Sequence, residues 1–193
     1  MIGGIVLAAG LSTRFPGKLF KEVGGRPVLL RVIDSFKMAA IDKTVVVANH
    51  VNASLLPAGV ETIINDRPEQ GMIYSIKMGL SRLIDADAVV ISPGDHPLIT
   101  SSDIDLLVAN RGDGKDLVVL THGGRIGHPI LIGRPLFPEV MLLSNEAGGL
   151  KKLLEMHALT KVESPNPGIL VDIDTAADLE LANSLLKTNT HRR

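Results

Sequence analysis

A glycine-rich turn near the start of the chain combines the residue types that bind phosphate. An apolar run ends at Gly10 and predicts a buried strand. Beyond it, Ser12 and Thr13 supply hydroxyl donors, and Arg14 and Lys18 supply positive charge. Glycine lets the backbone approach an anion closely, and exposed backbone N–H groups can donate to it. The turn therefore predicts a nucleotide site in which Arg14 and Lys18 bind the phosphates.

The spacing in this turn excludes a P-loop and makes the dinucleotide-binding fingerprint a weak match. A P-loop has four residues between its glycines and a Ser or Thr after its Lys, whereas six residues separate Gly10 from Gly17 here and Leu19 follows Lys18. A dinucleotide-binding strand would be followed by Gly-x-Gly-x-x-Gly, and no such triplet follows Leu7. A turn that only reverses the chain would not require two cations at these offsets. The remaining pattern is Leu-Ala-Ala-Gly-x-Ser-x-Arg, followed by a Lys and then by Gly-Gly-x-Pro.

A second turn, at residues 93–99, carries a carboxylate on a rigid backbone. The apolar run before it predicts a buried strand, and Pro93-Gly94-Asp95-His96-Pro97-Leu98-Ile99 leaves that strand. Proline and glycine restrict the path of such a turn. A fixed carboxylate at the end of a strand is suited to Mg²⁺, which takes one or two carboxylates together with nucleotide phosphates and water. The structural alternative is that Asp95 caps the turn or the next helix.

Taken in order, these segments resemble the MobA-like nucleotidyltransferases, in particular the molybdenum cofactor cytidylyltransferase branch. Residues 93–99 match the metal-binding segment of that family at every fixed position, with His96 at the variable one. The resemblance implies Mg²⁺ as cofactor, CTP as co-substrate and molybdopterin or another phosphate-bearing small molecule as acceptor. Within the family, the Ala8-Ala9-Gly10 form of the turn goes with CTP and a Leu-Ala-Gly-Gly form goes with GTP.

The resemblance also implies roles for residues outside the two turns. It places Gly71 and Ser75 near the nucleotide base, although both also suit an ordinary helix entry, and it places Gly127-His128-Pro129 on the acceptor side of the cleft. Asp172 and Asp174 lie near the metal, with Asp174 preferred, and on an expected strand they would point to the same face. The predicted catalytic residues are Arg14, Lys18 and Asp95; the nucleotide contacts are Leu7, Ala8, Ala9, Gly10, Ser12, Arg14, Lys18, Asn65, Gly71, Ser75, Pro93 and Gly94; the substrate contacts are His96, Gly127, His128 and Pro129; the metal ligands are Asp95, Asp174 and Asp172.

One segment departs from the family pattern. Relatives often carry Gly-Asp-x-Gly-x-Arg before a Leu-Leu helix, whereas this chain has Asn145-Glu146-Ala147-Gly148-Gly149-Leu150 there. The Asp is missing and Leu150 stands where an Arg is common, with Lys151 and Lys152 as the cations that could replace it.

The alternation of strands and helices predicts a three-layer α/β/α sandwich. We expect a Rossmann-like, mostly parallel sheet with one antiparallel addition, of the nucleotide-diphospho-sugar transferase type. A strand starting at Pro129 is expected at a sheet edge or as the antiparallel excursion, and Ser101 or Ser102 is expected to cap a helix. Residues 1–187 are expected to form a single domain and residues 188–193 a frayed tail. Ligands in such sheets bind beyond the carboxyl ends of the strands, which brings both turns to one rim.

Composition limits the classes of partner. The 193-residue chain has a formal net charge of -1 and 3% aromatic residues, which argues against a nucleic-acid partner. It has no Cys, which excludes disulfides and thiolate metal sites and fits a reducing compartment. No apolar run approaches the length of a membrane span, and the apolar start reads as a strand and not as a signal peptide. We therefore expect a cytoplasmic protein with no membrane partner.

Other activities remain open at this point. A guanylyl- or sugar-phosphate nucleotidyltransferase would use the same turns with a different base or acceptor. An NAD(P)H-dependent reductase on a related fold would use the glycine turn without a divalent metal. A non-catalytic carrier would bind the molybdenum cofactor and deliver it to a molybdoenzyme, which is also a conceivable partner of the transferase.

Overall fold

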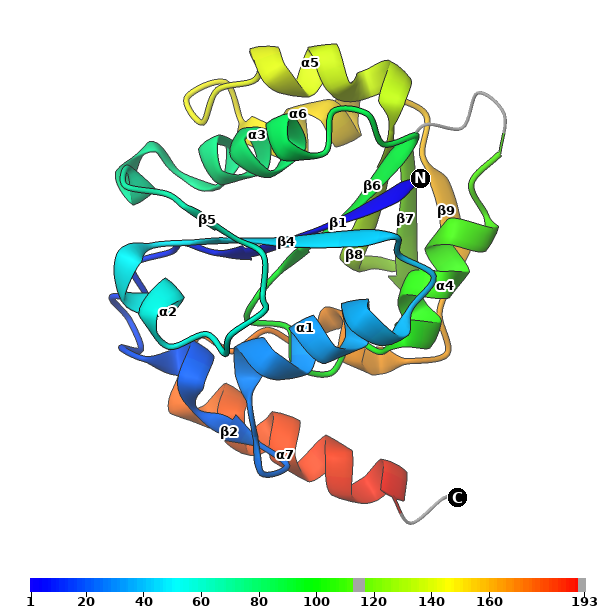
Figure 1. Cartoon of the computed structure of the whole chain (residues 1–193). Helices are drawn as coiled ribbons and strands as arrows, with labels where there is room; N and C mark the ends of the chain where they lie inside the picture. The colour runs from blue at the N-terminus through cyan, green and yellow to red at the C-terminus, as the bar shows by residue number, and fades with distance from the viewer. Residues whose placement is uncertain (113–116, 191–193) are drawn as a thin grey trace.

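A mostly parallel sheet forms the centre of the molecule, for which the computed structural model describes residues 1–112 and 117–190. Its strands are β1 (Ile2–Ala8), β4 (Lys43–Ala48), β5 (Thr62–Ile64), β6 (Ala88–Pro93), β7 (Leu117–His122), β8 (Arg125–Gly133) and β9 (Thr160–Glu163). They lie in the order β5-β4-β1-β6-β8-β7-β9, and β8 is antiparallel to both of its neighbours (Figure 1). The other neighbouring pairs are parallel. The expected sheet with one antiparallel addition is confirmed.

Helices cover both faces of the sheet and complete the expected three layers (Figure 1). On one face lie α1 (Val28–Met38), α4 (Ser101–Ala109) and α7 (Ala176–Thr190); on the other lie α3 (Met72–Arg82), α5 (Phe137–Leu142) and α6 (Gly149–Met156). The short helix α2 (His50–Ser54) follows β4, and a small hairpin of β2 (Glu22–Val23) and β3 (Arg26–Pro27) packs beside α7. None of the described helices has the length and apolar character needed to cross a membrane.

The two-residue repeat of the central strands divides the hydrophobic core into two layers. In β1, Val6 points toward the side of α1, where it joins the cluster around Phe36. Its neighbours Ile5 and Leu7 point to the opposite side, where they join the cluster around Ile76 on α3. Because successive side chains of a strand alternate between faces, a strand covered on both faces needs an unbroken apolar run. Strands β1 and β6 have such runs, which is why their positions are evident from the sequence.

Strand β8 differs from the sequence-based expectation in its place and start. It begins at Arg125 and lies between β6 and β7, so Pro129 is not on an edge strand. The pairing of β7 with β8 is irregular between Val119 and Thr121, and Pro129 falls within the stretch of β8 opposite this irregularity. Proline cannot donate to a sheet ladder, and a bulge is the interior position that tolerates it. Of the two alternatives expected for this strand, the structure confirms the antiparallel one, and the strand does not lie at the sheet edge.

Several local expectations were wrong or incomplete. The cap of α4 is Thr100, whose side chain forms a capping box with Asp103, in place of Ser101 or Ser102. Residues 171–174 are not a strand, so the argument that strand alternation aligns Asp172 with Asp174 does not apply. The expected frayed tail begins inside α7, which continues to Thr190, and residues 191–193 lie outside the described part of the chain.

Candidate active site

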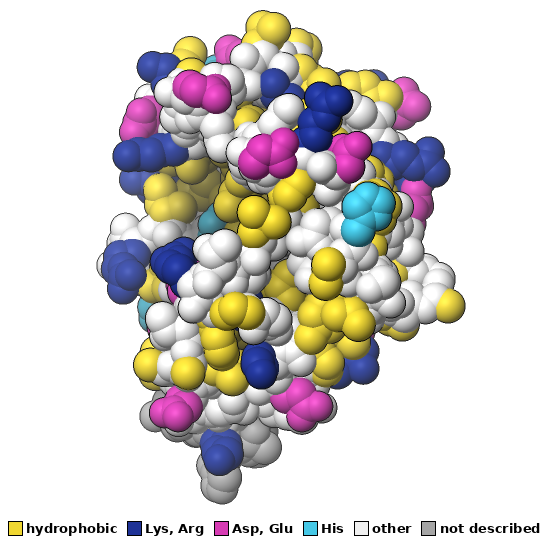
Figure 2. Space-filling view, turned by 90° about the vertical axis from the view of Figure 1, so that its left-hand side faces the viewer, with side chains coloured by type: hydrophobic (Ala, Val, Ile, Leu, Met, Phe, Trp, Pro, Cys, Tyr) yellow, Lys and Arg dark blue, Asp and Glu magenta, His cyan; other side chains and the backbone are white. Residues whose placement is uncertain are grey.

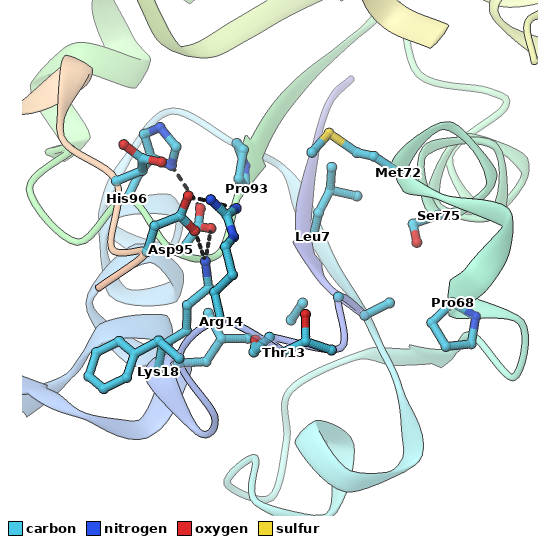
Figure 3. A pocket seen from close by; sticks show the side chains of 18 of the residues that line it. Leu7, Thr13, Arg14, Lys18, Pro68, Met72, Ser75, Pro93, Asp95 and His96 are labelled. Carbon is cyan, nitrogen blue, oxygen red and sulfur yellow. Dashed lines mark hydrogen bonds and ion pairs between the residues drawn. The ribbon is translucent and has the colours of Figure 1, made fainter. Parts of the chain in front are cut away.

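A cavity of about 630 Å³ opens where β1 and β6 end (Figure 3). It lies at the carboxyl ends of the parallel strands, where open α/β sheets bind ligands. In Figure 1 the carboxyl ends of β1 and β4 lie on the left, and Figure 2 shows this side, with acidic and basic side chains interspersed among hydrophobic ones. The residues that line the cavity are Leu7, Ala8, Ala9, Gly10, Ser12, Thr13, Arg14, Phe15, Lys18, Leu19, Pro68, Gly71, Met72, Ser75, Pro93, Asp95, His96, His128, Asp172 and Asp174.

A cluster of charged side chains occupies one side of this cavity. Lys18 Nζ lies 2.8 Å from Asp95 Oδ2 and 2.7 Å from Asp174 Oδ1. Arg14 Nη2 lies 2.8 Å from Asp174 Oδ2, and the Arg14 side chain is 76% exposed whereas that of Lys18 is 11% exposed. The two turns predicted to bind phosphate and metal therefore meet through a direct ion pair. Asp174 joins the cluster from a third segment, which enters α7.

The protonation states of the cluster follow from its contacts. Burial alone would lower the pKa of Lys18, but its hydrogen bonds to Asp174 and Asp95 and their negative charges raise it. Burial alone would raise the pKa of Asp95, but His96 and Lys18 hold it well below its usual range. Lys18 is therefore charged and Asp95 ionised at neutral pH. An ammonium group at the meeting point of two carboxylates is a charge arrangement that suits the binding of phosphate and of a divalent cation.

The position of Asp95 depends on a close backbone approach at Gly94. The N–H of Gly94 donates to the carbonyl oxygen of Leu7 at 2.7 Å, which joins the end of β6 to the end of β1. A Cβ atom at Gly94 would lie 2.9 Å from that oxygen and 2.7 Å from Leu29 Cδ1. Gly94 thus fixes the distance between the glycine turn and Asp95, although Gly94 itself does not line the cavity.

The Gly94→Ala variant is expected to lose about 1–3 kcal/mol of unfolding free energy, because the added methyl group meets a backbone oxygen and a packed side chain. Urea denaturation measures the loss. Gly10→Ala is the matched control, since a Cβ atom there would meet nothing within 4 Å. Equal stability of the Gly94→Ala variant and the wild type would contradict the close approach.

Two histidines extend the charged cluster into the protein. The Nδ1–H of His96 donates to Asp95 Oδ1 at 2.9 Å, since an ionised carboxylate only accepts. The His96 ring packs edge-on against that of His128, with the centroids 4.7 Å apart. His128 Nδ1 is buried and has no hydrogen-bond partner among the described residues. Burial, together with the charge of His96, lowers the pKa of His128 to about 3, so this ring is neutral at physiological pH.

A His128→Asn variant is expected to be less sensitive to acid than the wild type. The folded-state pKa of His128 is about 3, below its ordinary value of 6.5, so the stability that the neutral ring contributes is complete above pH 6.5 and is lost as the pH falls toward 3. Between pH 7 and pH 5, the unfolding free energy of the wild type should therefore fall by about 2 kcal/mol more than that of the variant. Urea titrations at both pH values measure this difference, and parallel pH profiles would contradict the buried neutral ring.

The opposite side of the cavity has a different character. Figure 3 shows Leu7, Met72, Ser75 and Pro68 across the open space from the charged cluster. Asn65 is completely buried and its Nδ2 donates to Ser75 Oγ at 2.9 Å. Because Ser75 Oγ accepts this bond, its own O–H remains to donate elsewhere, and the cavity is beside it. A side with apolar surface and one hydroxyl donor suits a nucleotide base, whereas the charged side suits phosphates.

Most of the predicted contacts line this one cavity, and four do not. Asn65 lines a neighbouring cavity of about 440 Å³ and contacts the site through its hydrogen bond to Ser75. Gly94 packs against Leu7 and Leu29. Gly127 and Pro129 flank His128 without lining the cavity. Pro68, Phe15 and Leu19 also line the cavity, although the sequence did not indicate them as contacts. Lys151 forms an ion pair with Glu155 along α6, and neither Lys151 nor Lys152 lines the cavity.

The carboxylates of the site fit a Mg²⁺ ion that shares its coordination with a nucleotide. Asp95 and Asp174 offer only oxygen ligands and converge on one point, the nitrogen of Lys18. Asp172 lines the same cavity. Within the described part of the chain, no group of three or more His, Cys, Asp and Glu side chains is placed to hold a metal ion. This donor set suits an ion that keeps several waters and phosphate oxygens in its shell.

Comparison with known proteins identifies the family. The family model for the MobA-like NTP transferase domain matches residues 4–162, which include both turns. The chain belongs to the MobA-like NTP transferase family. Among curated proteins it is similar to the bifunctional protein GlmU of Bdellovibrio bacteriovorus, with 34% identity over 61% of the chain. It is also similar to GlmU of Staphylococcus epidermidis, with 27% identity over 78% of the chain. The chain spans only 27% and 33% of the length of these two relatives.

Solved structures share the fold over nearly the whole chain. A homolog of Rv0371c from Mycobacterium sp. strain JC1 has a TM-score of 0.84 and 26% identity, with 97% of this chain and 98% of that one covered. Rv0371c from Mycobacterium tuberculosis H37Rv has a TM-score of 0.84 and 22% identity over 95% and 98%, and was also solved in complex with manganese. A CMP:2-keto-3-deoxy-manno-octonic acid synthetase in complex with CTP has a TM-score of 0.78 and 16% identity over 97% and 99%. These solved structures therefore show the fold of the present chain, whereas the family rests on the match to residues 4–162.

Proposed function

We propose that this protein is a nucleotidyltransferase that moves a nucleoside monophosphate, CMP from CTP, onto a phosphate-bearing acceptor and releases pyrophosphate. The acceptor is proposed to be molybdopterin or the molybdenum cofactor. The observation that carries the proposal is the meeting of Arg14, Lys18, Asp95 and Asp174 in one cavity at the ends of β1 and β6. Membership of the MobA-like NTP transferase family supports the class of reaction.

The side chains of the cluster would bind the triphosphate and neutralise its charge. Lys18 and the exposed Arg14 would hold the phosphates, while the cavity wall near Ser75 and Met72 would receive the base. A phosphate oxygen of the acceptor attacks the α-phosphorus, and the bond to pyrophosphate breaks. That oxygen is already ionised at neutral pH, so no side chain has to remove a proton from it. Positioning and charge neutralisation would supply most of the rate.

A divalent cation, with Mg²⁺ as the proposed ion, would be held by Asp95 and Asp174, with Asp172 nearby, and would supply further neutralisation of the phosphates when bound. The oxygen-only donors support this choice, and so does the manganese complex of the structurally similar Rv0371c. The neutral His128 and its neighbour His96 lie beside these carboxylates and are proposed to contact the acceptor.

The choice of base and acceptor has separate support. The Ala8-Ala9-Gly10 turn supports CTP, and so does the complex of the structurally similar synthetase with that nucleotide. A sugar phosphate is the second candidate acceptor, because residues 145–150 lack the Asp and Arg that relatives often carry there. Both acceptors present an ionised phosphate oxygen, so the same cluster would serve either.

A thermal-shift panel of CTP, GTP, ATP, UTP and NADPH, each with and without Mg²⁺, tests class and base together. A ligand that binds only the native state raises the melting temperature. The proposal predicts the largest Mg²⁺-dependent shift with CTP. A shift with NADPH alone, independent of Mg²⁺, would instead favour a reductase.

A further inference from the structure

The two carboxylates that meet at Lys18 come from segments that no sheet ladder joins. Asp95 lies in the loop after β6, and Asp174 lies at the end of residues 164–175, which we call the strap. The strap contains one 3₁₀ turn, η4 (Pro167–Leu170), and is otherwise irregular. Because its own secondary structure does not fix its course, other contacts must set the distance between Asp174 and Asp95.

A buried carboxylate, Asp103 on α4, lies at the junction of these two segments. It is 3% exposed. Its Oδ2 accepts hydrogen bonds from Thr100 N at 2.9 Å and Thr100 Oγ1 at 2.7 Å, at the end of the Asp95 loop. Its Oδ1 accepts from Ser164 Oγ at 2.7 Å, and its Oδ2 also accepts from Asn166 Nδ2 at 2.7 Å. One side chain therefore binds both the loop that carries Asp95 and the start of the strap that carries Asp174.

The bonds around Asp103 continue along both segments. Asn166 Nδ2 also donates to the carbonyl oxygen of Leu98 at 2.9 Å, and Asn166 Oδ1 accepts from Gly168 N at 2.9 Å. A Cβ atom at Gly168 would lie 2.6 Å from Leu98 Cβ, so strap and loop are in close contact there. Farther on, the N–H of Ile173 donates to the carbonyl oxygen of Asp95 itself at 2.9 Å. Contacts between the strap and the loop therefore run along the strap, from Ser164 and Asn166, which bind Asp103, to Ile173, the residue before Asp174.

A helix cap alone does not account for these contacts. The capping box of α4 needs only the reciprocal bonds between Thr100 and Asp103. Asp103 accepts two further bonds from the strap, from a serine that is completely buried and from Asn166. A buried carboxylate is costly unless donors surround it, and here the donors come from the two segments that form the site.

We propose that Asp103 is a positioning residue for the transfer reaction, which sets the separation of Asp95 and Asp174 by tying the strap to the loop. The inference rests on the proposed function for its kinetic consequence, but its structural consequence is independent of it. Loss of Asp103 should release the strap, while the parallel strands and the glycine turn keep their places.

Amide hydrogen exchange tests the structural consequence without any substrate. In an Asp103→Ala protein, exchange of the Gly168 and Ile173 amides should be at least about 10-fold faster than in the wild type, with amides of β1 and β4 unchanged. Asp105→Ala is the matched control, because Asp105 is on the same helix but accepts its hydrogen bond from the backbone N–H of Ala40, which belongs neither to the strap nor to the Asp95 loop. Unchanged exchange at Gly168 and Ile173 in folded Asp103→Ala protein would overturn the proposal.

Kinetics test the positioning role. The Asp103→Ala enzyme should lose about 10²-fold in kcat with KM for the nucleotide little changed, since a displacement of about 1 Å at a reacting centre costs that much. Asp103→Asn should recover most of the activity, because its amide oxygen can take the place of Oδ2 as the acceptor for Thr100 and Asn166. An equal kcat loss in the Asp103→Ala and Asp105→Ala enzymes, or no recovery by Asn, would contradict the proposal.

A second variant covers the case in which Asp103→Ala does not fold. Asn166→Ala removes the amide that bridges Asp103 and Leu98 but leaves the capping box intact, and it should accelerate exchange at Ile173 in the same way. Unchanged exchange in this variant would count against the proposal. If the wild type itself releases no pyrophosphate from any nucleotide, the proposed function fails, whereas the exchange result still decides whether Asp103 holds the strap.

Discussion

An Asp95→Ala enzyme is expected to turn over its nucleotide at least about 10²-fold more slowly than the wild type, the scale of losing a main electrostatic stabiliser. Asp95 is held by Lys18 on one oxygen and by His96 on the other, on a loop fixed by Gly94. Its replacement removes a carboxylate from the cluster without changing the core. Steady-state pyrophosphate release at saturating nucleotide measures the effect.

Three other aspartates provide comparisons for this variant, one on the surface and two in the cavity. Asp34 pairs with Arg26 on the surface, and Asp34→Ala should keep wild-type turnover. Asp174→Ala should match the loss in Asp95→Ala, because it contacts the same lysine, and Asp172→Ala should lose less. Undiminished activity of the Asp95→Ala enzyme would refute its assignment as a metal ligand.

A Lys18→Met enzyme is expected to lose about 10²- to 10³-fold in kcat/KM. The variant removes the positive charge that lies 2.8 Å from Asp95 and 2.7 Å from Asp174, so two carboxylates are left facing the incoming triphosphate. Nucleotide binding in the absence of Mg²⁺ should weaken as well, because Lys18 is proposed to bind the phosphates directly. The change in melting temperature on adding nucleotide measures this binding.

Two further lysine variants separate charge from geometry. Lys18→Arg retains the charge, but a planar guanidinium differs in shape from an ammonium group placed between two carboxylates, so we expect only partial activity. Lys43 forms a surface ion pair with Glu61, and Lys43→Met should behave as the wild type. Full activity of the Lys18→Met enzyme would contradict the role given to this residue.

Much of the site could be predicted because its residues lie in short, self-contained turns. The glycine turn joins its hydroxyls and cations within nine residues, from Gly10 to Lys18, and the turn after β6 joins Asp95 to its rigid prolines. Both follow buried strands, which are evident as apolar runs, so their meeting at one rim follows from the topology of a parallel sheet. The ion pair between Lys18 and Asp95 agrees with that expectation.

The parts that the sequence did not reveal depend on contacts between distant segments. Asp172 and Asp174 share the cavity because an irregular strap carries them there, not because a strand alternates. The buried roles of Asn65 and Asp103 depend on partners elsewhere in the chain, Ser75 for one and Ser164 and Asn166 for the other. In β9 the only apolar residue is Val162, and the strand lies at the edge of the sheet, so its sequence lacks the apolar run that marks the inner strands.

The most direct test of the central claim is pyrophosphate release by the purified protein with CTP or GTP, molybdopterin or a sugar phosphate, and with or without Mg²⁺. We predict release that requires Mg²⁺, is fastest with CTP and molybdopterin, and is at least about 10²-fold slower in the Asp95→Ala enzyme. Release that is equally fast in the Asp95→Ala enzyme, or no release from any combination, would contradict the claim that the cluster of Arg14, Lys18, Asp95 and Asp174 is a nucleotidyl-transfer site.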